Sequence, residues 1–529
     1  GPYMFDVVIT RGIVVDGSGK PGYPADVGIL DGKIEAIGDL SQAETARVID
    51  ASGLTVSPGF IDSHTHSDAS LLTNPQHAQG LRQGITTEIL GQDGLSYAPL
   101  SADNYETYRR YLAGILGRAP ADLDMSSVAA FRSHYHNKTA INTAYLVAHG
   151  AIRLETCGFQ DVPMTGDRMT HALRLVEEGM EQGAVGLATG LSYHPHSWST
   201  TEEIVELCGP VQKAGGVYVT HLRDVHPERG FGGGGVPEAL EIGRRSGVKV
   251  HFSHYRTAAG NAGKVAEQLA PIDAAKAEGL DITLELYPYP TGSTFAVSNL
   301  PSWASEGGPE EILDRLSDPA DRARIVEHLE SMGKRSIAES VLSHLPRHPQ
   351  YEGMSVADIA DDLGKGLGET MCHMLVEEDL EVGFWLTPPD SVATWRQTSR
   401  DAIDFLSRPD YMVGSDSIQA GGSPHPRAYG TFPRFLGRLR RRYAKITLEQ
   451  MIQRVTDNPA QRFGLTSRGR VEKGYFADLV VFDPDRIIDT ATYDEPRHHP
   501  AGIPYVLVNG KVAVDGERCT GVLAGQAIP

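Results

Sequence analysis

The sequence predicts an α/β protein with a central (β/α)8 barrel, a small β-sandwich domain built from both termini, and an inserted helical segment. Three observations lead to this fold class. Short β-like runs crowd both ends of the chain, eight apolar runs of strand length alternate with helical intervals between them, and one interval is too long for a single connection. The length of 529 residues suits one large barrel with a smaller partner.

Both ends of the chain carry short strands separated by turn signals. The predicted strands cover residues 5–10, 12–15, 25–30 and 33–37 at the start, and 478–482, 505–508 and 511–514 at the end. Asp31-Gly32 and Asn509-Gly510 are typical of hairpin turns. Because the middle of the chain lacks this character, we expect residues 1–57 and 466–529 to form one small β-sandwich domain.

The central region, residues 58–465, alternates strands with helices. Its eight predicted strands, the first of which begins just before this region, are residues 55–61, 85–90, 142–148, 184–188, 217–220, 248–253, 282–286 and 411–414. Intervals such as residues 170–182 and 237–245 carry the apolar spacing of a helix. Eight such units predict a closed, TIM-like barrel.

An insertion is expected at about residues 295–380, where the interval is too long for one connection between a strand and a helix. It contains charged, helix-like segments at residues 309–316 and 321–332. Long insertions in barrels usually occur in the loops of the catalytic face, so we expect a helical segment that acts as a lid.

Charge and composition narrow the range of partners. A formal net charge of -20 disfavours non-specific binding to nucleic acid or to an anionic membrane. No apolar run is long enough to span a bilayer, and the four cysteines are far apart in the sequence, as is usual in a reducing compartment. We therefore expect a cytoplasmic protein with a small-molecule partner, without nucleic-acid or membrane partners; a homo-oligomer is compatible with the sequence.

Residue types that bind metals recur where the predicted strands end. His64 and His66 follow the first strand, His221 the fifth, His254 the sixth and Asp416 the eighth. Residues two apart in an extended segment face the same side, and the carboxyl ends of barrel strands converge on one site. Nitrogen ligands favour Zn²⁺, although a mixed nitrogen and oxygen set also accepts Mn²⁺, Co²⁺ or Fe²⁺.

These residues are part of a longer pattern that resembles the amidohydrolase superfamily. The segment Pro-Gly-Phe-Ile-Asp-Ser-His-Thr-His at residues 58–66, followed by the later histidines and the aspartate, is similar to that superfamily. Further segments resemble its N-acyl-D-amino-acid deacylase (D-aminoacylase) branch. They are residues 84–87, 149–150, 186–190, 220–223, 287–289, 414–416, 425–427, 430–434 and 456–460.

The resemblance implies a zinc-dependent hydrolase that acts on non-peptide C–N bonds. It would cleave the amide bond of N-acyl-D-amino acids, or of related small acylated amines, to a carboxylate and a free amine. A metal-bound hydroxide would attack the amide, with Asp416 as general base and then general acid. One or two metal ions are implied, and the implied ligands are His64, His66, Asp93, His221, His254 and Asp416.

Asp93 departs from the pattern of the family. Where the family usually presents a cysteine in a turn, this chain has Gly91-Gln92-Asp93-Gly94. Asp93 is either an ordinary turn residue before a glycine or a carboxylate ligand in place of the thiolate. A carboxylate is a harder ligand, which leaves the identity and the number of the metal ions open.

The remaining site residues also follow from the resemblance. Tyr287 would hydrogen-bond the oxyanion, and Arg256, Ser293 and Arg427 would bind the substrate carboxylate. Each has an alternative: the tyrosine could pack with its hydroxyl satisfied, and the arginines could form structural ion pairs. His149 also ends a strand, where a contact with the substrate and a structural hydrogen bond are both open.

Two other functions compete with this interpretation. A cyclic-amide hydrolase of the hydantoinase or dihydropyrimidinase type is the nearest rival, but residues 184–191 contain no lysine that could be carboxylated to bridge two metals. A non-catalytic barrel scaffold would be expected to have lost metal ligands, and this chain keeps them. The sequence therefore favours the linear-amide hydrolase.

Overall fold

An eight-stranded parallel barrel forms the centre of the molecule in a computed structural model, which describes residues 4–529 without the side chains of Lys334 and Arg335. The strands are β8 (Phe60–Asp62), β9 (Ile85–Leu90), β10 (Asn142–Ala148), β11 (Gly186–Gly190), β12 (Val217–His221), β13 (Lys249–Phe252), β14 (Ile282–Leu286) and β18 (Tyr411–Val413). Each pairs in parallel with the next in this order. The N–H of Ser63 donates to the carbonyl of Val413 at 3.1 Å and closes the ring. The predicted barrel is confirmed.

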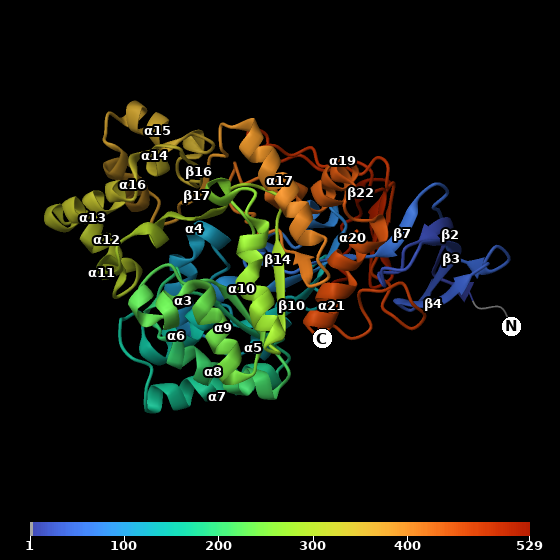
Figure 1. Cartoon of the computed structure of the whole chain (residues 1–529), viewed down its shortest axis with the longest axis horizontal. Helices are drawn as coiled ribbons and strands as arrows, with labels where there is room; N and C mark the ends of the chain where they lie inside the picture. Colours follow the sequence, from blue (N-terminus) through green and yellow to red (C-terminus); the bar gives the residue numbers. More distant parts are fainter. Residues whose placement is uncertain (1–3) are drawn as a thin grey trace.

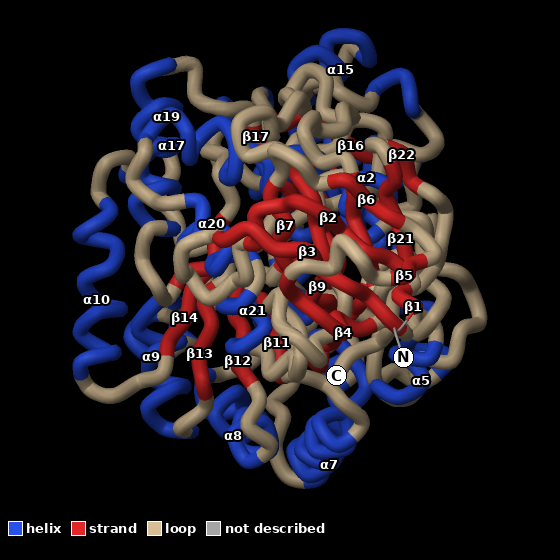
Figure 2. The backbone as a smooth tube through the Cα atoms, turned by 90° about the vertical axis from the view of Figure 1, so that its right-hand side faces the viewer, coloured by secondary structure: helices blue, strands red, loops and turns tan. Residues whose placement is uncertain are grey.

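Helices cover the outside of this barrel. Those that follow β10 to β13 in the chain include α7 (Asp167–Glu181), α8 (Thr201–Lys213), α9 (Gly235–Ser246) and α10 (Val265–Ala277). Figure 2 shows α8, α9 and α10 outside strands β12 to β14. Every residue of β9 and of β10 is buried, because these strands are covered on both faces. This is why the strands appear in the sequence as continuous apolar runs.

The first predicted strand, residues 55–61, is divided in the structure. Its first half is β7 (Thr55–Pro58), which pairs with strands of the terminal sheet, and its second half is β8 of the barrel. Gly59 separates them, and its N–H donates to the carbonyl of Asp478 at 2.7 Å. A Cβ at this position would lie 2.1 Å from Thr86 Oγ1, so only glycine permits this approach.

A second sheet joins the two ends of the chain. Its strands, in spatial order, are β22 (Arg518–Cys519), β21 (Lys511–Asp515), β20 (Tyr505–Val508), β19 (Leu479–Phe482), β7, β2 (Val7–Val14), β3 (Tyr23–Leu30) and β4 (Lys33–Gly38), with β6 (Val48–Asp50) beside β2. Apolar side chains from both ends pack into one cluster, among them Ile9, Val27 and Leu479. The predicted β-sandwich domain built from both termini is confirmed.

The long interval between β14 and helix α17 (Val392–Leu406) forms a separate lobe, at the upper left of Figure 1. Its helices are α11 (Ser302–Ser305), α12 (Pro309–Ser317), α13 (Pro319–Ser331), α14 (Lys334–Ala338), α15 (Val356–Leu363) and α16 (Leu367–Glu377). A three-stranded antiparallel sheet, absent from the prediction, lies beside them and consists of β15 (Ser293–Phe295), β17 (Gly383–Leu386) and β16 (Ser340–His344). We call the region from β15 to β17 the insertion lobe.

Two findings bear on the cysteines and on membranes. Cys157, Cys208, Cys372 and Cys519 all have free thiols, and the first three are buried. Within residues 4–529, none of the helices combines the length and the apolar character that crossing a bilayer requires.

Candidate metal and active site

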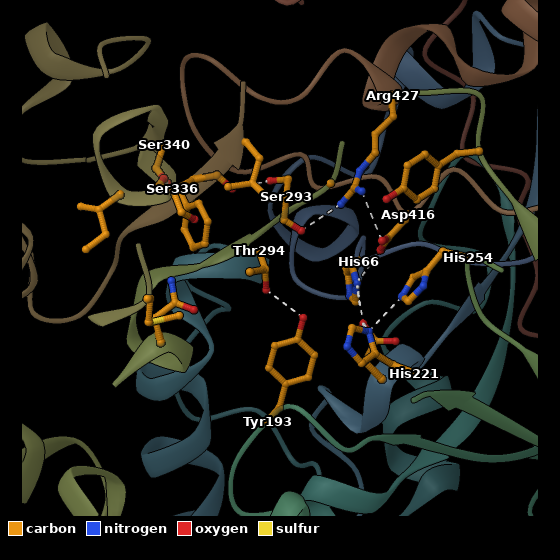
Figure 3. A pocket seen from close by; sticks show the side chains of 18 of the residues that line it. His66, Tyr193, His221, His254, Ser293, Thr294, Ser336, Ser340, Asp416 and Arg427 are labelled. Carbon is orange, nitrogen blue, oxygen red and sulfur yellow. Dashed lines mark hydrogen bonds and ion pairs between the residues drawn. The ribbon is translucent and has the colours of Figure 1, made fainter. Parts of the chain in front are cut away.

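The predicted ligands meet at the carboxyl-terminal end of the barrel. His64 and His66 follow β8, His221 is the last residue of β12, and His254 follows β13. Asp416 follows β18. Figure 3 shows His66, His221, His254 and Asp416 turned toward one another on one side of a cavity. The topology thus brings together residues that are up to 352 positions apart in the chain.

Four of these side chains form a first ligand group, consisting of His64, His66, Asp93 and Asp416. Asp416 Oδ1 lies 3.2 Å from His64 Nε2 and 2.9 Å from His66 Nε2. Asp93 Oδ1 lies 3.4 Å from His64 Nε2, and its Oδ2 lies 3.3 Å from His66 Nε2. All four residues are buried, so water does not screen their charges.

A second ligand group shares Asp93 with the first and adds His221 and His254. Asp93 Oδ2 lies 4.0 Å from His221 Nδ1, which is 2.9 Å from His254 Nε2. Burial and the neighbouring His221 lower the pKa of His254 to about 4, so this imidazole is neutral near pH 7. A neutral imidazole is the form that binds a metal.

The donor atoms fit a divalent cation. Among the described residues, His64 Nε2, Asp93 Oδ1 and Asp416 Oδ1 are buried and have no hydrogen-bond partner. Buried polar atoms in proteins are nearly always satisfied, so unsatisfied atoms that converge on one point indicate a ligand. The donors are imidazole nitrogens and carboxylate oxygens, a set that suits zinc.

The charges of the first ligand group leave its carboxylates ionised, and a metal ion would replace the proton that they hold on His66. Burial lowers the pKa of His66, but Asp416 and Asp93 outweigh it and raise that pKa to about 9. Burial raises the pKa of Asp416, yet Arg427 and His64 hold it well below its usual range. The pKa of Asp93 is also held well below its usual range, because His64 and His66 outweigh its burial. Both carboxylates are therefore ionised, as cation ligands must be.

Three of the ligands have a left-handed backbone conformation. The φ angles are 61° at Asp93, 33° at His254 and 55° at Asp416. Non-glycine residues rarely adopt this region, and such strain tends to occur at functional sites. The strained residues belong to three different loops, so the surrounding fold holds each of them in place.

Close packing fixes the turn that carries Asp93. A Cβ on Gly190, the last residue of β11, would lie 2.3 Å from the carbonyl oxygen of Asp93. His196 Nε2–H donates to that same carbonyl oxygen at 2.7 Å. Gly190 therefore lets the turn lie directly against β11, and the carboxylate of Asp93 reaches both ligand groups.

The outer nitrogens of two ligand histidines are also held. His64 Nδ1 lies 2.9 Å from Glu285 Oε1, and His221 Nε2 lies 2.8 Å from Ser192 Oγ. Ser192 donates to Asp224 at 2.5 Å, so it must accept from His221. Both histidines thus donate from the outer nitrogen and turn the inner nitrogen toward the ligand groups, where it can bind a metal.

Sequence reasoning did not single out Glu285. The residue lies in β14, in the run Ile-Thr-Leu-Glu-Leu, and is fully buried. An ionisable side chain in the middle of a buried apolar strand was the signal that could have found it.

The ligands form the inner end of a cavity of about 380 Å³. Beside them, Tyr287 lies between two guanidinium groups, those of Arg256 and Arg427, each 4.7 Å from the centre of its ring. Arg256 Nη2 donates to the hydroxyl oxygen of Tyr287 at 3.0 Å, and Arg427 Nη1 lies 3.3 Å from Asp416 Oδ2. Two cations and a phenol thus face the space next to the ligands.

Two other predicted residues differ in their placement. Ser293 lines the cavity, but its hydroxyl donates to the carbonyl of Phe384 at 2.8 Å. His149 lies outside the lining of this cavity. Its Nε2 is 2.7 Å from Glu203 Oε2, and Arg153 faces the same carboxylate at 3.3 Å. His149 therefore makes the structural hydrogen bond that the sequence left open, and its contact with a substrate stays a prediction.

The insertion lobe supplies the outer wall of the cavity. Its apolar contributors are Leu329, Met332, Ile337, Met371, Phe384 and Leu386. Ser336 and Ser340 lie on the same side, opposite the ligands in Figure 3. Among the side chains that the structure describes along this cavity, Arg256 and Arg427 are the only arginines, no lysine is present, and both arginines are at the ligand end.

Known sequences resemble the chain along its whole length. The sequence profile of the amidohydrolase family matches residues 47–155 and 401–514. A D-aminoacylase of Alcaligenes xylosoxydans xylosoxydans is 32% identical, over 99% of this chain and 97% of its own. An N-acyl-D-glutamate deacylase of the same organism is 34% identical, over 96% of this chain and 93% of its own.

Solved structures show the same similarity. An N-acyl-D-glutamate deacylase from Bordetella bronchiseptica, solved with zinc and a phosphonate inhibitor, has a TM-score of 0.82 and 31% identity, with 99% of this chain and 100% of that chain covered. A D-aminoacylase with a binuclear metal centre has a TM-score of 0.80 and 32% identity, with 99% of each chain covered. A D-hydantoinase, at 17% identity and a TM-score of 0.57, shares the fold alone.

Proposed function

The chain belongs to the N-acyl-D-amino-acid deacylase (D-aminoacylase) family of metal-dependent amidohydrolases, and from this premise we propose that it hydrolyses N-acyl-D-amino acids to a carboxylate and a free amine. One observation carries the proposal: two ligand groups that share Asp93 lie beside Tyr287, the buried Arg427 and the half-buried Arg256. The ligand groups and Tyr287 are placed to act on the amide bond at one end of the cavity. The two arginines are placed to bind the substrate carboxylate next to it.

The two ligand groups would hold zinc. The first would use His64, His66, Asp93 and Asp416, and the second would use Asp93, His221 and His254. When bound, zinc lowers the pKa of water to about 7 and polarises a carbonyl oxygen. An amide needs both effects, because its carbon is a poor electrophile and its nitrogen a poor leaving group.

Asp416 is the proposed general base and general acid. Its Oδ1 faces the imidazoles of His64 and His66, whereas its Oδ2 faces Arg427. Oδ2 would accept the proton of the attacking water and later deliver it to the departing nitrogen. Arg427 keeps the carboxylate ionised and ready to accept that proton.

Tyr287 is the proposed donor to the oxyanion. Its hydroxyl oxygen already accepts a hydrogen bond from Arg256, so its own proton remains available for donation. A donor aimed at developing negative charge lowers the barrier more than it strengthens substrate binding.

Arg256 and Arg427 are the proposed partners of the substrate carboxylate. Arg427 is fully buried, and among the described residues its Nε has no hydrogen-bond partner. A buried guanidinium with a free N–H offers a charge-assisted hydrogen bond. Ser293 would first have to release the carbonyl of Phe384 before its hydroxyl could donate to the same group.

The apolar wall of the insertion lobe supports a preference for substrates with an uncharged, apolar side chain or acyl group. Such a group would displace water from Leu329, Met371 and Phe384. A second carboxylate would face this wall without a cation among the described side chains. The cytoplasmic location and a homo-oligomeric state stay predictions from the sequence.

A panel of zinc-loaded assays tests the proposal. Release of free amine is measured with N-acetyl-D-leucine, N-acetyl-D-methionine, N-acetyl-D-aspartate, N-acetyl-D-glutamate and their L-enantiomers. We expect turnover of D-substrates. Asp416→Asn should still bind zinc through the second ligand group but lose about 10²- to 10⁴-fold in kcat, because it cannot accept the proton.

Asp404→Asn is a matched control for this variant. Asp404 pairs with Lys445 at the surface and is remote from the cavity lining, so the control should keep wild-type turnover. The proposal fails if no D-substrate releases amine. Full activity in Asp416→Asn would remove this residue from its role.

A further inference from the structure

Glu285 lies beneath the metal site and contacts ligands of both groups. Its Oε1 lies 2.9 Å from Nδ1 of His64, a member of the first ligand group. Its Oε2 accepts the backbone N–H of His254, a member of the second group, at 3.2 Å. The side chain is fully buried, so no water competes for either contact.

The carboxylate of Glu285 sets which nitrogen of His64 faces the ligand group. An ionised carboxylate only accepts, so Nδ1 of His64 donates to Glu285 and Nε2 is the nitrogen available to a metal. Nε2 is also the nitrogen that points at Asp93 and Asp416. His251 stands on the other side of the carboxylate, with its Nε2 3.4 Å from Oε1.

A glycine makes room for this carboxylate. A Cβ on Gly414, the residue after β18, would lie 2.3 Å from Oε2 of Glu285 and 2.7 Å from Cβ of His64. Any larger residue would therefore displace the carboxylate and the ligand together. The space is shaped for Glu285 and His64 in their present arrangement.

We propose that Glu285 is a positioning residue that holds ligands of both groups at once, so that metal affinity in each group depends on it. This rests on the proposed metal-dependent function but not on the identity of the substrate. Through Oε1 it fixes the ring and the tautomer of His64. Through Oε2 it holds the backbone of His254, whose φ of 33° is strained and needs such support.

The substitution Glu285→Gln distinguishes the positioning role of the carboxylate from a role in which the side chain only fills space. A carboxylate accepts at both oxygens, whereas an amide offers one acceptor and one donor. While Nε2 of His64 stays free for a metal, Glu285→Gln can therefore keep the bond to His64 or the bond to His254, but not both. Glu285→Asp keeps both acceptor oxygens. Its side chain is one methylene shorter, so both oxygens lie farther from His64 and His254.

The test is the zinc affinity of the metal-free protein, which is measured by competition with a chromophoric chelator. We expect Glu285→Gln to lower the affinity of every zinc-binding step that the wild type shows by about 10- to 100-fold. Glu285→Asp should weaken the same steps less. The visible absorption spectrum of the Co²⁺ form should change in both variants, because the ligand geometry changes.

Glu203→Gln is the matched control. Glu203 is also a buried barrel glutamate, but it pairs with His149 and Arg153 and contacts none of the ligands. It should bind zinc as the wild type does. A zinc-binding step that Glu285→Gln leaves unchanged would overturn the proposal, as would an equal loss in Glu203→Gln.

Two further measurements keep the test decisive. Circular dichroism of each metal-free variant establishes that it is folded before affinity is compared. If Glu285→Gln does not fold, Glu285→Asp alone decides: wild-type zinc affinity in that variant contradicts the proposal. Because no substrate is present, the result is independent of whether the protein proves to be a deacylase.

Discussion

Tyr287 contributes to the proposed reaction through one proton. Its hydroxyl oxygen accepts from Arg256, so the proton it carries is free to meet the oxyanion. We expect Tyr287→Phe to lower kcat by about 10²- to 10³-fold with little change in KM, because the bond forms mainly in the transition state. Steady-state kinetics on the best D-substrate measure this.

Tyr289→Phe is the control for that variant. Tyr289 is two residues away and buried, and its hydroxyl has no hydrogen-bond partner among the described residues. The control should keep the kcat of the wild type. A Tyr287→Phe enzyme with unchanged kcat would assign the oxyanion to another donor.

At the residue scale, the sequence predicts ligands better than the groups that hold them. His64, His221 and Asp416 are recognisable because metal-binding residue types at strand ends are unusual. Glu285 was not predicted because its contacts depend on which strands become neighbours. The local sequence pattern does not contain that information. His149 has the same position relative to its strand as the ligands do, and only the structure shows that Glu203 engages it.

At the element scale, the turn after β9 depends on the backbone of β11. We expect Gly190→Ala to push the Asp93 turn away, because the new Cβ would lie 2.3 Å from the carbonyl oxygen of Asp93 and 2.8 Å from its Cβ. Overpacking of this kind costs about 1–3 kcal/mol of stability. Thermal unfolding and zinc content should both fall.

Gly209→Ala in helix α8 is the matched control for this substitution. Apart from its chain neighbours and the backbone of its own helix, no atom lies within 4 Å of a Cβ built at Gly209, so the methyl group meets no packed side chain. Alanine favours a helix over glycine by about 0.5–1 kcal/mol. Pro210 follows and disfavours a Cβ on the helical residue before it, so we expect this control to unfold close to the wild-type temperature. Wild-type zinc content in Gly190→Ala would show that the turn does not need the glycine.

The insertion lobe should set substrate preference. Met332 lines the cavity and is 48% exposed, so a longer side chain fits there without a burial penalty. We expect Met332→Arg to shift the ratio of kcat/KM for N-acetyl-D-glutamate over N-acetyl-D-leucine by roughly 10-fold toward the acidic substrate. Ala323→Arg adds the same charge at an exposed position outside the cavity lining and should leave that ratio unchanged.

An unchanged ratio in Met332→Arg would show that the substrate side chain does not reach the insertion lobe. The sequence predicts two helices of this lobe, at residues 309–316 and 321–332, which correspond to α12 and α13, and it does not single out the other four. It does not predict β15, β16 and β17, since these strands are three to five residues long, and β15 and β16 mix polar with apolar side chains. Their pairing comes from contacts that are distant in sequence.

At the scale of the whole molecule, the barrel brings residues that are distant in the sequence close together. The eight strands are predictable because burial on both faces makes them continuously apolar. The division of the first strand at Gly59 is not, because only the approach of Thr86 and Asp478 shows that the chain leaves one sheet for another there. The two terminal segments pack as one unit because each leaves an apolar face that the other covers.

The location of bound metal tests the central claim most directly. Crystals of the zinc-loaded protein, measured at the zinc absorption edge, give an anomalous difference map that locates the ions without reference to the assumed site. We predict a peak coordinated by Asp93 together with the histidines of one or both ligand groups. A map with its zinc peak elsewhere, or with none at Asp93, would contradict the account.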